Sequence, residues 1–332
     1  MSEALATAHP NVALSKYWGK RPGGGRFPAV PSLSVTLAGL ATRTRVRFDR
    51  GLIDDRVVLH GLPADERTRG RVVELLDRVR AAAGEPRRAE VVSHNDFPTA
   101  SGLASSASGF AALALAATRA AGLDWGPPRV SDLARRSSVS AARSIYGGFV
   151  ELGAGPLAPA EGEVLAAQPL AAADHLALVV LVCVTTEEPK AIGSSDGMQM
   201  TAERSPYSHA WLEEAPRLHQ RLRAAVLAND FESVGELAEA SALAMHASAI
   251  SAGVIYWTGA TLQALSTVHA LRRAGTPAFA TIDAGPHVKV LAPPAHSVRV
   301  REAMQATPGV LRVIDARPGE GARLVAGAQA TA

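Results

Sequence analysis

The spacing of apolar residues predicts three helices in the first half of the chain. Between Val72 and Val79, apolar residues recur at intervals of three and four, and a glycine and a proline follow, so we expect an amphipathic helix over about 66–83. Residues 104–121 are rich in Ala, Leu and Phe with one glycine as the only breaker, which is typical of a buried helix. A third helix is expected at 131–137.

Strands are predicted around these helices. The first forty residues alternate short apolar segments with turns rich in glycine and proline, which favours β-structure there. A short strand is expected at 89–93, and the apolar run 176–184 reads as a central strand.

The pattern changes after this run. Long helical segments are expected at about 205–228, 231–248 and 259–274, followed by β-like residues at 278–283 and 288–291. We therefore predict an α+β protein of two domains, residues 1–184 and residues 185–332.

Length and composition narrow the class of protein. A chain of 332 residues, 47% hydrophobic and 20% charged, is long enough for one large or two ordinary domains and too apolar for wholesale disorder. The nine-residue run 176–184 is far shorter than the roughly 20 residues that span a bilayer. The N-terminus lacks the basic start and apolar segment of a signal peptide, so we expect a cytoplasmic protein that does not contact membranes.

Charge and cysteine content exclude further classes. The net charge is only +3 and the basic residues are dispersed, which argues against a nucleic-acid partner. The single cysteine, Cys183, excludes a disulfide framework, and no histidine spacing indicates a metal site. Only four of the 34 basic residues are lysines, yet Lys16 and Lys20 lie within five residues, where a compact ammonium group can matter.

The strongest chemical signal is the stretch 98–107, a Gly/Ser-rich loop that leads into a predicted helix. Small residues let backbone N–H groups approach an anion, hydroxyls add donors, and the helix N-terminus favours negative charge. Neither GxxxxGK[ST] in the chain nor GxGxxG in this loop is present, so a P-loop NTPase or dinucleotide site is not indicated. Taken alone, the loop fits an ordinary helix cap as well as an anion site.

Two further stretches carry candidate chemistry. Ser138, Ser140 and Arg143 lie close together before a Gly-Gly pair, a combination that suits phosphate or carboxylate groups, although a solvated loop fits equally well. Asp283 ends a strand-like run just before Gly-Pro, which is typical of a turn residue and also suits a catalytic base at a strand end.

These stretches occur together in a recognisable order. The matching segments are Asn11–Arg21, Ser32–Leu37, Pro98–Ala107, Ser138–Gly148, Gly197-Met198, Ser205-Pro206, Met245–Ala247 and Asp283–Pro286. Over residues about 7 to 291 the chain resembles the mevalonate diphosphate decarboxylases of the GHMP kinase superfamily. The resemblance implies a two-domain GHMP-kinase-like α+β fold, with the active site in a cleft between an ATP-binding N-terminal domain and a C-terminal domain.

The resemblance also implies an activity. Members phosphorylate the 3-hydroxyl of a mevalonate derivative with ATP and Mg²⁺, after which phosphate and CO₂ leave together and give an isopentenyl product. By match, Asp283 would orient or deprotonate the hydroxyl, Lys16 would stabilise charge at the transferring phosphoryl group, and Arg143 would hold the substrate carboxylate. Further residues implied for the substrate are Tyr17, Lys20, Ser138, Ser140 and Ser194, and those implied for ATP are Gly102, Ala104, Ser105, Ser106 and Ser108. No protein ligand for Mg²⁺ is predicted, and a homodimer is expected.

The chain departs from the family pattern at several positions. Pro22 stands where many relatives have an acidic residue, Val139 replaces a glycine and His287 an asparagine. Residues 194–196 are Ser-Ser-Asp, where some bacterial relatives carry an arginine just before Gly-Met, so one contact to a substrate diphosphate is missing.

Because Lys16, Arg143 and Asp283 are all present, we expect a decarboxylase that acts on mevalonate 5-diphosphate. The alternatives are a mevalonate 5-phosphate decarboxylase, a small-molecule kinase that phosphorylates without decarboxylation, and a non-catalytic nucleotide-binding protein.

Overall fold

The computed structural model describes residues 3–23, 25–97, 105–158, 160 and 162–325. Its strands are β1 (Glu3–Ala8), β2 (Asn11–Ser15), β3 (Ser32–Ala38), β4 (Thr42–Asp49), β5 (Arg56–Leu59), β6 (Leu62–Pro63), β7 (Arg88–Asn95), β8 (Phe149–Leu152), β9 (Gln168–Ala171), β10 (Val179–Val184), β11 (Phe279–Ile282), β12 (Val288–Ala292), β13 (Arg312–Pro318) and β14 (Arg323–Leu324). Its α-helices are α1 (Glu66–Ala83), α2 (Ser105–Ala120), α3 (Pro127–Ser137), α4 (Ser194–Arg204), α5 (Ser208–Leu227), α6 (Phe231–Ser251), α7 (Gly259–Arg273) and α8 (Ser297–Gln305). Two 3₁₀ helices are η1 (Val139–Ile145) and η2 (Pro294–His296).

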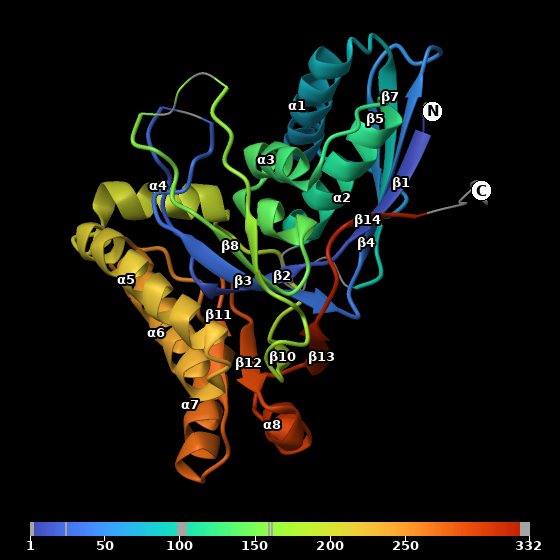
Figure 1. The fold of residues 1–332 in the computed structure, drawn as a ribbon. Coiled ribbons are helices and arrows are strands. Elements are labelled where there is room, and N and C mark those ends of the chain that lie inside the picture. The colour runs from blue at the N-terminus through green and yellow to red at the C-terminus, as the bar shows by residue number, and fades with distance from the viewer. Residues whose placement is uncertain (1–2, 24, 98–104, 159, 161, 326–332) are drawn as a thin grey trace.

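Two sheets organise these elements (Figure 1). One has six strands in the order β14-β1-β4-β7-β5-β6, and α1, α2 and α3 lie on one side of it. The other has eight strands in the order β11-β12-β10-β13-β3-β8-β9, with β2 paired to β3, and α5, α6 and α7 flank it. The predicted mixture of helices and strands in two domains is therefore confirmed.

The predicted helix over 66–83 is confirmed as α1, and its ends follow from local chemistry. Asp65 accepts a hydrogen bond from the backbone N–H of Thr68 at 2.9 Å, which satisfies an orphan donor of the first turn. Gly84 ends the helix with φ 62°, a left-handed conformation that favours glycine.

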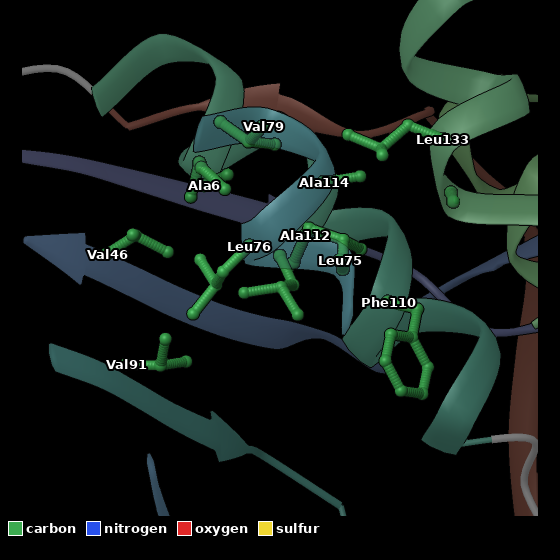
Figure 2. Close-up of a cluster of buried hydrophobic side chains, with 14 of the residues drawn as sticks. Ala6, Val46, Leu75, Leu76, Val79, Val91, Phe110, Ala112, Ala114 and Leu133 are labelled. Atoms are coloured by element: carbon green, nitrogen blue, oxygen red, sulfur yellow. The ribbon is translucent and has the colours of Figure 1, made fainter. Parts of the chain in front are cut away.

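The apolar face of α1 packs into the core of the first sheet (Figure 2). Leu75, Leu76 and Val79 of α1 face Val46 of β4 and Val91 of β7, all fully or nearly fully buried. Alanines of α2 fill the remaining space and let this helix approach β1 and β4 closely.

The second sheet joins the beginning of the chain to its end. β13 pairs with β3, and β14 returns to pair with β1 of the first sheet. β10, which the predicted boundary at 184/185 places in the N-terminal domain, pairs on its two edges with β12 and β13. The boundary itself stays a prediction, but the sheet that carries β10 draws strands from both halves of the chain.

The other predicted elements agree with the structure to within a few residues. The pattern did not reveal the helices α4 and α8 or the strands β4, β5, β6, β8, β9, β13 and β14. No α-helix among the described residues is long and apolar enough to cross a bilayer.

Close packing of α6 on β11 sets the position of the strand that ends at the candidate base. A Cβ added at Gly235 of α6 would lie 2.1 Å from Cδ2 of the buried Phe279 ring in β11, so either the ring or the helix would have to shift. Gly109 of α2 is its matched control, because nothing lies within 4 Å of a Cβ there.

We expect Gly235→Ala to lower the free energy of unfolding by about 1–3 kcal/mol through overpacking. Gly109→Ala should leave it unchanged or raise it by up to about 1 kcal/mol, because alanine is the better helix former. Urea denaturation of both variants measures the difference. A Gly235→Ala variant as stable as Gly109→Ala would contradict the packing constraint.

Candidate active site

Asp283 lies between two buried lysines. It directly follows β11, and its Oδ1 accepts a hydrogen bond from Lys16 Nζ at 2.7 Å. Its Oδ2 is 3.2 Å from Lys289 Nζ, which β12 supplies. Both lysine side chains are 2% exposed, but the carboxylate is 26% exposed, so one face of the cluster remains open to a ligand.

Lys16 is held in this position from two directions. It directly follows β2, where a register shift between Ala13 and Ser15 turns the end of the strand, and its Nζ donates a hydrogen bond to the Ala13 carbonyl at 2.8 Å. Its backbone N–H donates to Ser241 Oγ of α6 at 3.0 Å. The ammonium group is therefore fixed by β2 and by a helix far away in the sequence.

Arg143 is a buried cation held by neutral hydroxyls. It lies in η1, is 1% exposed, and donates from Nε to Ser34 Oγ at 2.9 Å and from Nη1 to Ser32 Oγ at 2.7 Å. Within the described part of the chain no carboxylate lies within ion-pair distance of it. A buried guanidinium without a counter-charge is costly, and binding a carboxylate or phosphate would compensate that cost.

Burial and neighbouring charges decide the protonation of the cluster. Burial lowers the pKa of Lys16 to about 8; Asp283 acts to raise it, and Lys289 and Arg143 lower it further. Burial acts to raise the pKa of Asp283, but the ammonium groups of Lys16 and Lys289 outweigh this and hold that pKa well below its usual range. Burial also lowers the pKa of Arg143 to about 10. At neutral pH the site thus carries an ionised carboxylate and an excess of positive charge.

The residues expected to contact substrate lie at different places around this cluster. The Tyr17 hydroxyl is buried without a hydrogen-bond partner among the described residues, and burial raises its pKa. Ser138 Oγ and Ser140 Oγ are 3.3 Å apart at the start of the segment that carries Arg143. Ser194 opens α4, and its Oγ accepts a hydrogen bond from Lys190 Nζ at 2.8 Å.

The expected nucleotide loop falls largely outside the described residues. Gly102 and Ala104 lie there, and the description resumes at Ser105, where α2 begins. Ser106 is exposed in the first turn of α2, whereas Ser108 is buried with its Oγ 2.6 Å from Thr42 Oγ1. The ATP contacts of this loop and helix stay predictions.

Sequence reasoning missed two lysines of the site. Lys289 binds Asp283, and Lys190 Nζ donates to the Ala284 carbonyl at 3.0 Å as well as to Ser194. Lys20 Nζ donates to Ser195 Oγ at 2.9 Å, so all four lysines of the chain lie at or beside the site. The scarcity of lysine was the available signal, because a chain that otherwise uses arginine retains lysine where a compact charge is needed.

The part of the chain that the structure describes forms no metal site from its side chains alone. Among the described residues, no group of three His, Cys, Asp or Glu side chains could hold a metal ion. Mg²⁺ bound together with phosphates keeps several waters and needs only one or two protein carboxylates, so it does not require such a group.

The fold and the charged cluster at the junction of its two halves define an enzyme of the GHMP-kinase-like class. Residues 8–161 match the model of the diphosphomevalonate decarboxylase-like N-terminal domain. Residues 180–315 match that of the mevalonate 5-diphosphate decarboxylase C-terminal domain. The chain belongs to the mevalonate diphosphate decarboxylase family.

Individual relatives extend this likeness over most of the chain. A phosphomevalonate decarboxylase of Haloferax volcanii is 34% identical over 307 residues, which are 91% of this chain and 92% of the relative. A diphosphomevalonate decarboxylase of Aspergillus fumigatus is 32% identical over 86% of this chain and 76% of the relative.

Solved structures of related proteins show the same likeness over nearly the whole chain. The mevalonate diphosphate decarboxylase of Staphylococcus aureus matches with a TM-score of 0.91 at 33% identity, over 97% of this chain and 98% of the other. A structure described as MDDEF in complex with MVAPP, AMPPCP and magnesium matches with a TM-score of 0.90 at 36% identity, over the same shares.

Removal of the central carboxylate tests the electrostatic role of Asp283. Asp283→Asn leaves two buried ammonium groups beside Arg143 without a counter-charge. Breaking a buried pair costs about 3–5 kcal/mol. Because a quarter of this carboxylate is exposed, we expect a loss of about 3 kcal/mol of unfolding free energy at pH 7. Asp124→Asn, at a side chain 91% exposed, is the control and should change stability little.

The loss of unfolding free energy in Asp283→Asn should become smaller at alkaline pH. The folded protein releases the Lys16 proton near pH 8 and the unfolded chain only near its ordinary pKa of 10.5, so rising pH across this window favours the folded state. In Asp283→Asn the pKa of Lys16 falls further and this gain is larger. Urea denaturation of wild type and Asp283→Asn at pH 7 and at pH 9.5 measures the difference in unfolding free energy at each pH. A difference that grows with pH would contradict the lowered pKa of Lys16 and its pairing with Asp283.

Proposed function

We propose that this chain catalyses the ATP-dependent decarboxylation of mevalonate 5-diphosphate to isopentenyl diphosphate, with ADP, phosphate and CO₂ as the other products. The observation that carries the proposal is the cluster of Lys16, Asp283 and Lys289 with Arg143 nearby, in a chain of this family. The reaction belongs to isoprenoid biosynthesis.

The chemistry requires a better leaving group and a fixed carboxylate. A tertiary hydroxyl is a poor nucleophile, and hydroxide is a poor leaving group. ATP with Mg²⁺, when bound, supplies the phosphoryl group that converts the 3-hydroxyl into a leaving group. Ser105 and Ser106 at the start of α2, with the loop before it, are the residues that would hold the ATP phosphates.

Asp283 orients the 3-hydroxyl rather than removing its proton early. Two ammonium groups hold the pKa of this carboxyl well below its usual range, which makes it a weak base but a permanently ionised hydrogen-bond acceptor. Lys16, on the same carboxylate, stabilises negative charge that develops at the reacting oxygen. Lys289 keeps the second carboxylate oxygen in place, so the exposed face of Asp283 points to the substrate.

Arg143 holds the carboxylate that is lost as CO₂. Its Nε and Nη1 are fixed by Ser34 and Ser32, so the guanidinium is already in position before substrate binds. Ser138 and Ser140 on the same segment, together with Tyr17 and Lys20, are suited to the 5-phosphate end.

Decarboxylation of mevalonate 5-phosphate is the second candidate. The Haloferax volcanii relative carries that name, and residues 194–196 of this chain lack the arginine of some bacterial relatives. A cytoplasmic location, a homodimer, and the absence of nucleic-acid and membrane partners stay predictions of the same proposal.

An assay of ADP and CO₂ release with ATP and Mg²⁺ tests the function. Equal amounts of the two products from mevalonate 5-diphosphate, with the higher kcat/KM for that substrate, are expected. Asp283→Asn and Arg143→Gln should each lower kcat by at least ~10²-fold, because each removes a group that contacts the reacting part of the substrate. ADP without CO₂ would indicate a kinase, and neither product from mevalonate or its two 5-phosphorylated forms would refute the proposal.

The pH dependence of kcat/KM should report the ammonium group of Lys16. Activity is expected to fall as pH rises through about 8, where this group loses its proton. Lys289→Met removes a like charge that lowers the pKa of Lys16, so the alkaline fall should move to higher pH.

Lys20→Met is the matched control, because Lys20 is not among the groups that shift the pKa of Lys16. It should raise KM and leave the position of the alkaline fall unchanged. A fall that stays near pH 8 in Lys289→Met would show that another group controls it.

A further inference from the structure

A basic pocket lies beside the expected phosphate end of the substrate. Its lining residues are Lys20, Arg21, Gly25, Arg26, Glu74, Arg78 and Arg136. The charge of Arg26 acts on Lys20, on the Tyr17 hydroxyl and on Arg71, because it contributes to the pKa of each of these groups. The pocket is therefore lined by the predicted substrate residue Lys20, lies near Tyr17, and has an excess of positive charge.

The backbone at Arg26 is strained and held in place. Arg26 has φ 52°, a left-handed conformation that a non-glycine residue adopts at a cost of about 1 kcal/mol or more. Buried Arg135 donates from Nη1 to the Gly25 carbonyl at 2.6 Å and to the Arg26 carbonyl at 3.2 Å, and Asp132 fixes Arg135 in turn. The residue is thus anchored to α3, and strain kept by such contacts is typical of functional sites.

Arg26 and Arg71 converge on one carbonyl group. Arg26 Nη1 donates to the Ser137 carbonyl at 2.7 Å, and Arg71 Nη2 donates to the same oxygen at 2.8 Å. Ser137 immediately precedes Ser138, one of the residues expected to bind substrate. Two guanidinium groups are therefore brought together at the edge of the expected phosphate site.

Several polar atoms around these guanidinium groups are buried without a partner. Tyr17 Oη, Arg71 Nε and Ser137 Oγ make no hydrogen bond within the described residues. Leaving such atoms unsatisfied costs about 1–3 kcal/mol each, so oxygen atoms of a ligand would be favourable partners for them. Donors of this kind beside an excess of cations suit a phosphate group.

The contact between Arg26 and its carboxylate neighbour is weak. Arg26 Nη2 is 3.5 Å from Glu74 Oε2, whereas Arg78 binds the same carboxylate at 2.7 Å. The Arg26 side chain is 34% exposed, so Nη2 can exchange this weak contact for a ligand oxygen while Nη1 keeps its hydrogen bond to the Ser137 carbonyl.

We propose that Arg26 binds the terminal phosphate of a 5-diphosphate substrate and makes the chain prefer it to the 5-monophosphate. The inference rests on the proposed function. Arg26, in the loop after Lys20, would supply a guanidinium in place of the arginine that residues 194–196 lack. Arg26 is a specificity-determining residue here, because it lies away from the reacting groups at Asp283.

Substrate comparison in an Arg26→Gln variant tests the proposal. Gln keeps the strained backbone and a long side chain but removes the charge. One charge-assisted hydrogen bond to phosphate is worth roughly a tenfold change or more, so kcat/KM for mevalonate 5-diphosphate should fall by ~10-fold or more, mainly through KM. The kcat/KM for mevalonate 5-phosphate should change by less than about threefold. The ratio of kcat/KM for the diphosphate to kcat/KM for the monophosphate should therefore fall. Arg26→Lys should lie between wild type and Arg26→Gln.

Arg136→Gln is the matched control, because it removes the same charge from the same pocket. Arg136 Nε binds Asp132 at 2.7 Å and Nη2 donates to the Glu163 carbonyl at 2.7 Å, so this guanidinium is already held by protein partners, and the substrate ratio should stay as in wild type. Thermal denaturation of each variant establishes that it is folded.

Calorimetric titration with inorganic pyrophosphate and inorganic phosphate gives a readout that needs no turnover. Arg26→Gln should lose affinity for pyrophosphate and little for phosphate, whereas equal affinities in wild type and variant would overturn the role of Arg26. An active wild type with an unchanged substrate ratio in Arg26→Gln would overturn it as well. If wild type releases no CO₂ from either substrate, the proposed function fails, which is a distinct result.

Discussion

The ion pair between Asp283 and Lys16 is the contact on which the site depends, since it joins residues 267 positions apart in the chain. A carboxylate beside one ammonium group would be an ordinary salt bridge. Lys289 on the other oxygen, together with the burial of both lysines, turns it into a permanently ionised acceptor and lowers the pKa of Lys16 to about 8. The same arrangement leaves one face of the carboxylate exposed, so stability and reactivity are set by one group of charges.

The sheet that runs through both halves of the chain is what makes this contact possible. β2 and β3 bring Lys16 and the serines that hold Arg143, whereas β11 and β12 bring Asp283 and Lys289, and β13 connects the two sets by pairing with β3. An error in the packing of α6 on β11 would therefore move the carboxylate relative to the lysine, because α6 also accepts the backbone N–H of Lys16. Accurate placement of reacting groups is a large part of catalysis, and here long-range strand pairing provides it.

Both kinds of cation occur at each end of the site. At the reacting end, Lys16 and Lys289 concentrate compact charge on Asp283 and Arg143 lies nearby. At the expected phosphate end, arginines and Lys20 line the pocket, and the forked donors of the arginines match phosphate oxygens. The chain lacks the arginine that some bacterial relatives carry before Gly-Met, and the proposed contact of Arg26 with the terminal phosphate would take its place.

The sequence by itself determined the local elements and the identity of the chemical groups. Helical spacing between Val72 and Val79 predicted α1 because burial of one helix face is a local periodic requirement, and the order of motifs predicted the family. Only the tertiary structure decided that Lys289 shares Asp283 with Lys16, that Ser32 and Ser34 hold Arg143, and that Arg26 meets Arg71 at Ser137. These contacts have no periodic signature, because they arise where strands and helices distant in the chain pack together, and the pKa of each group depends on charges that such packing brings near.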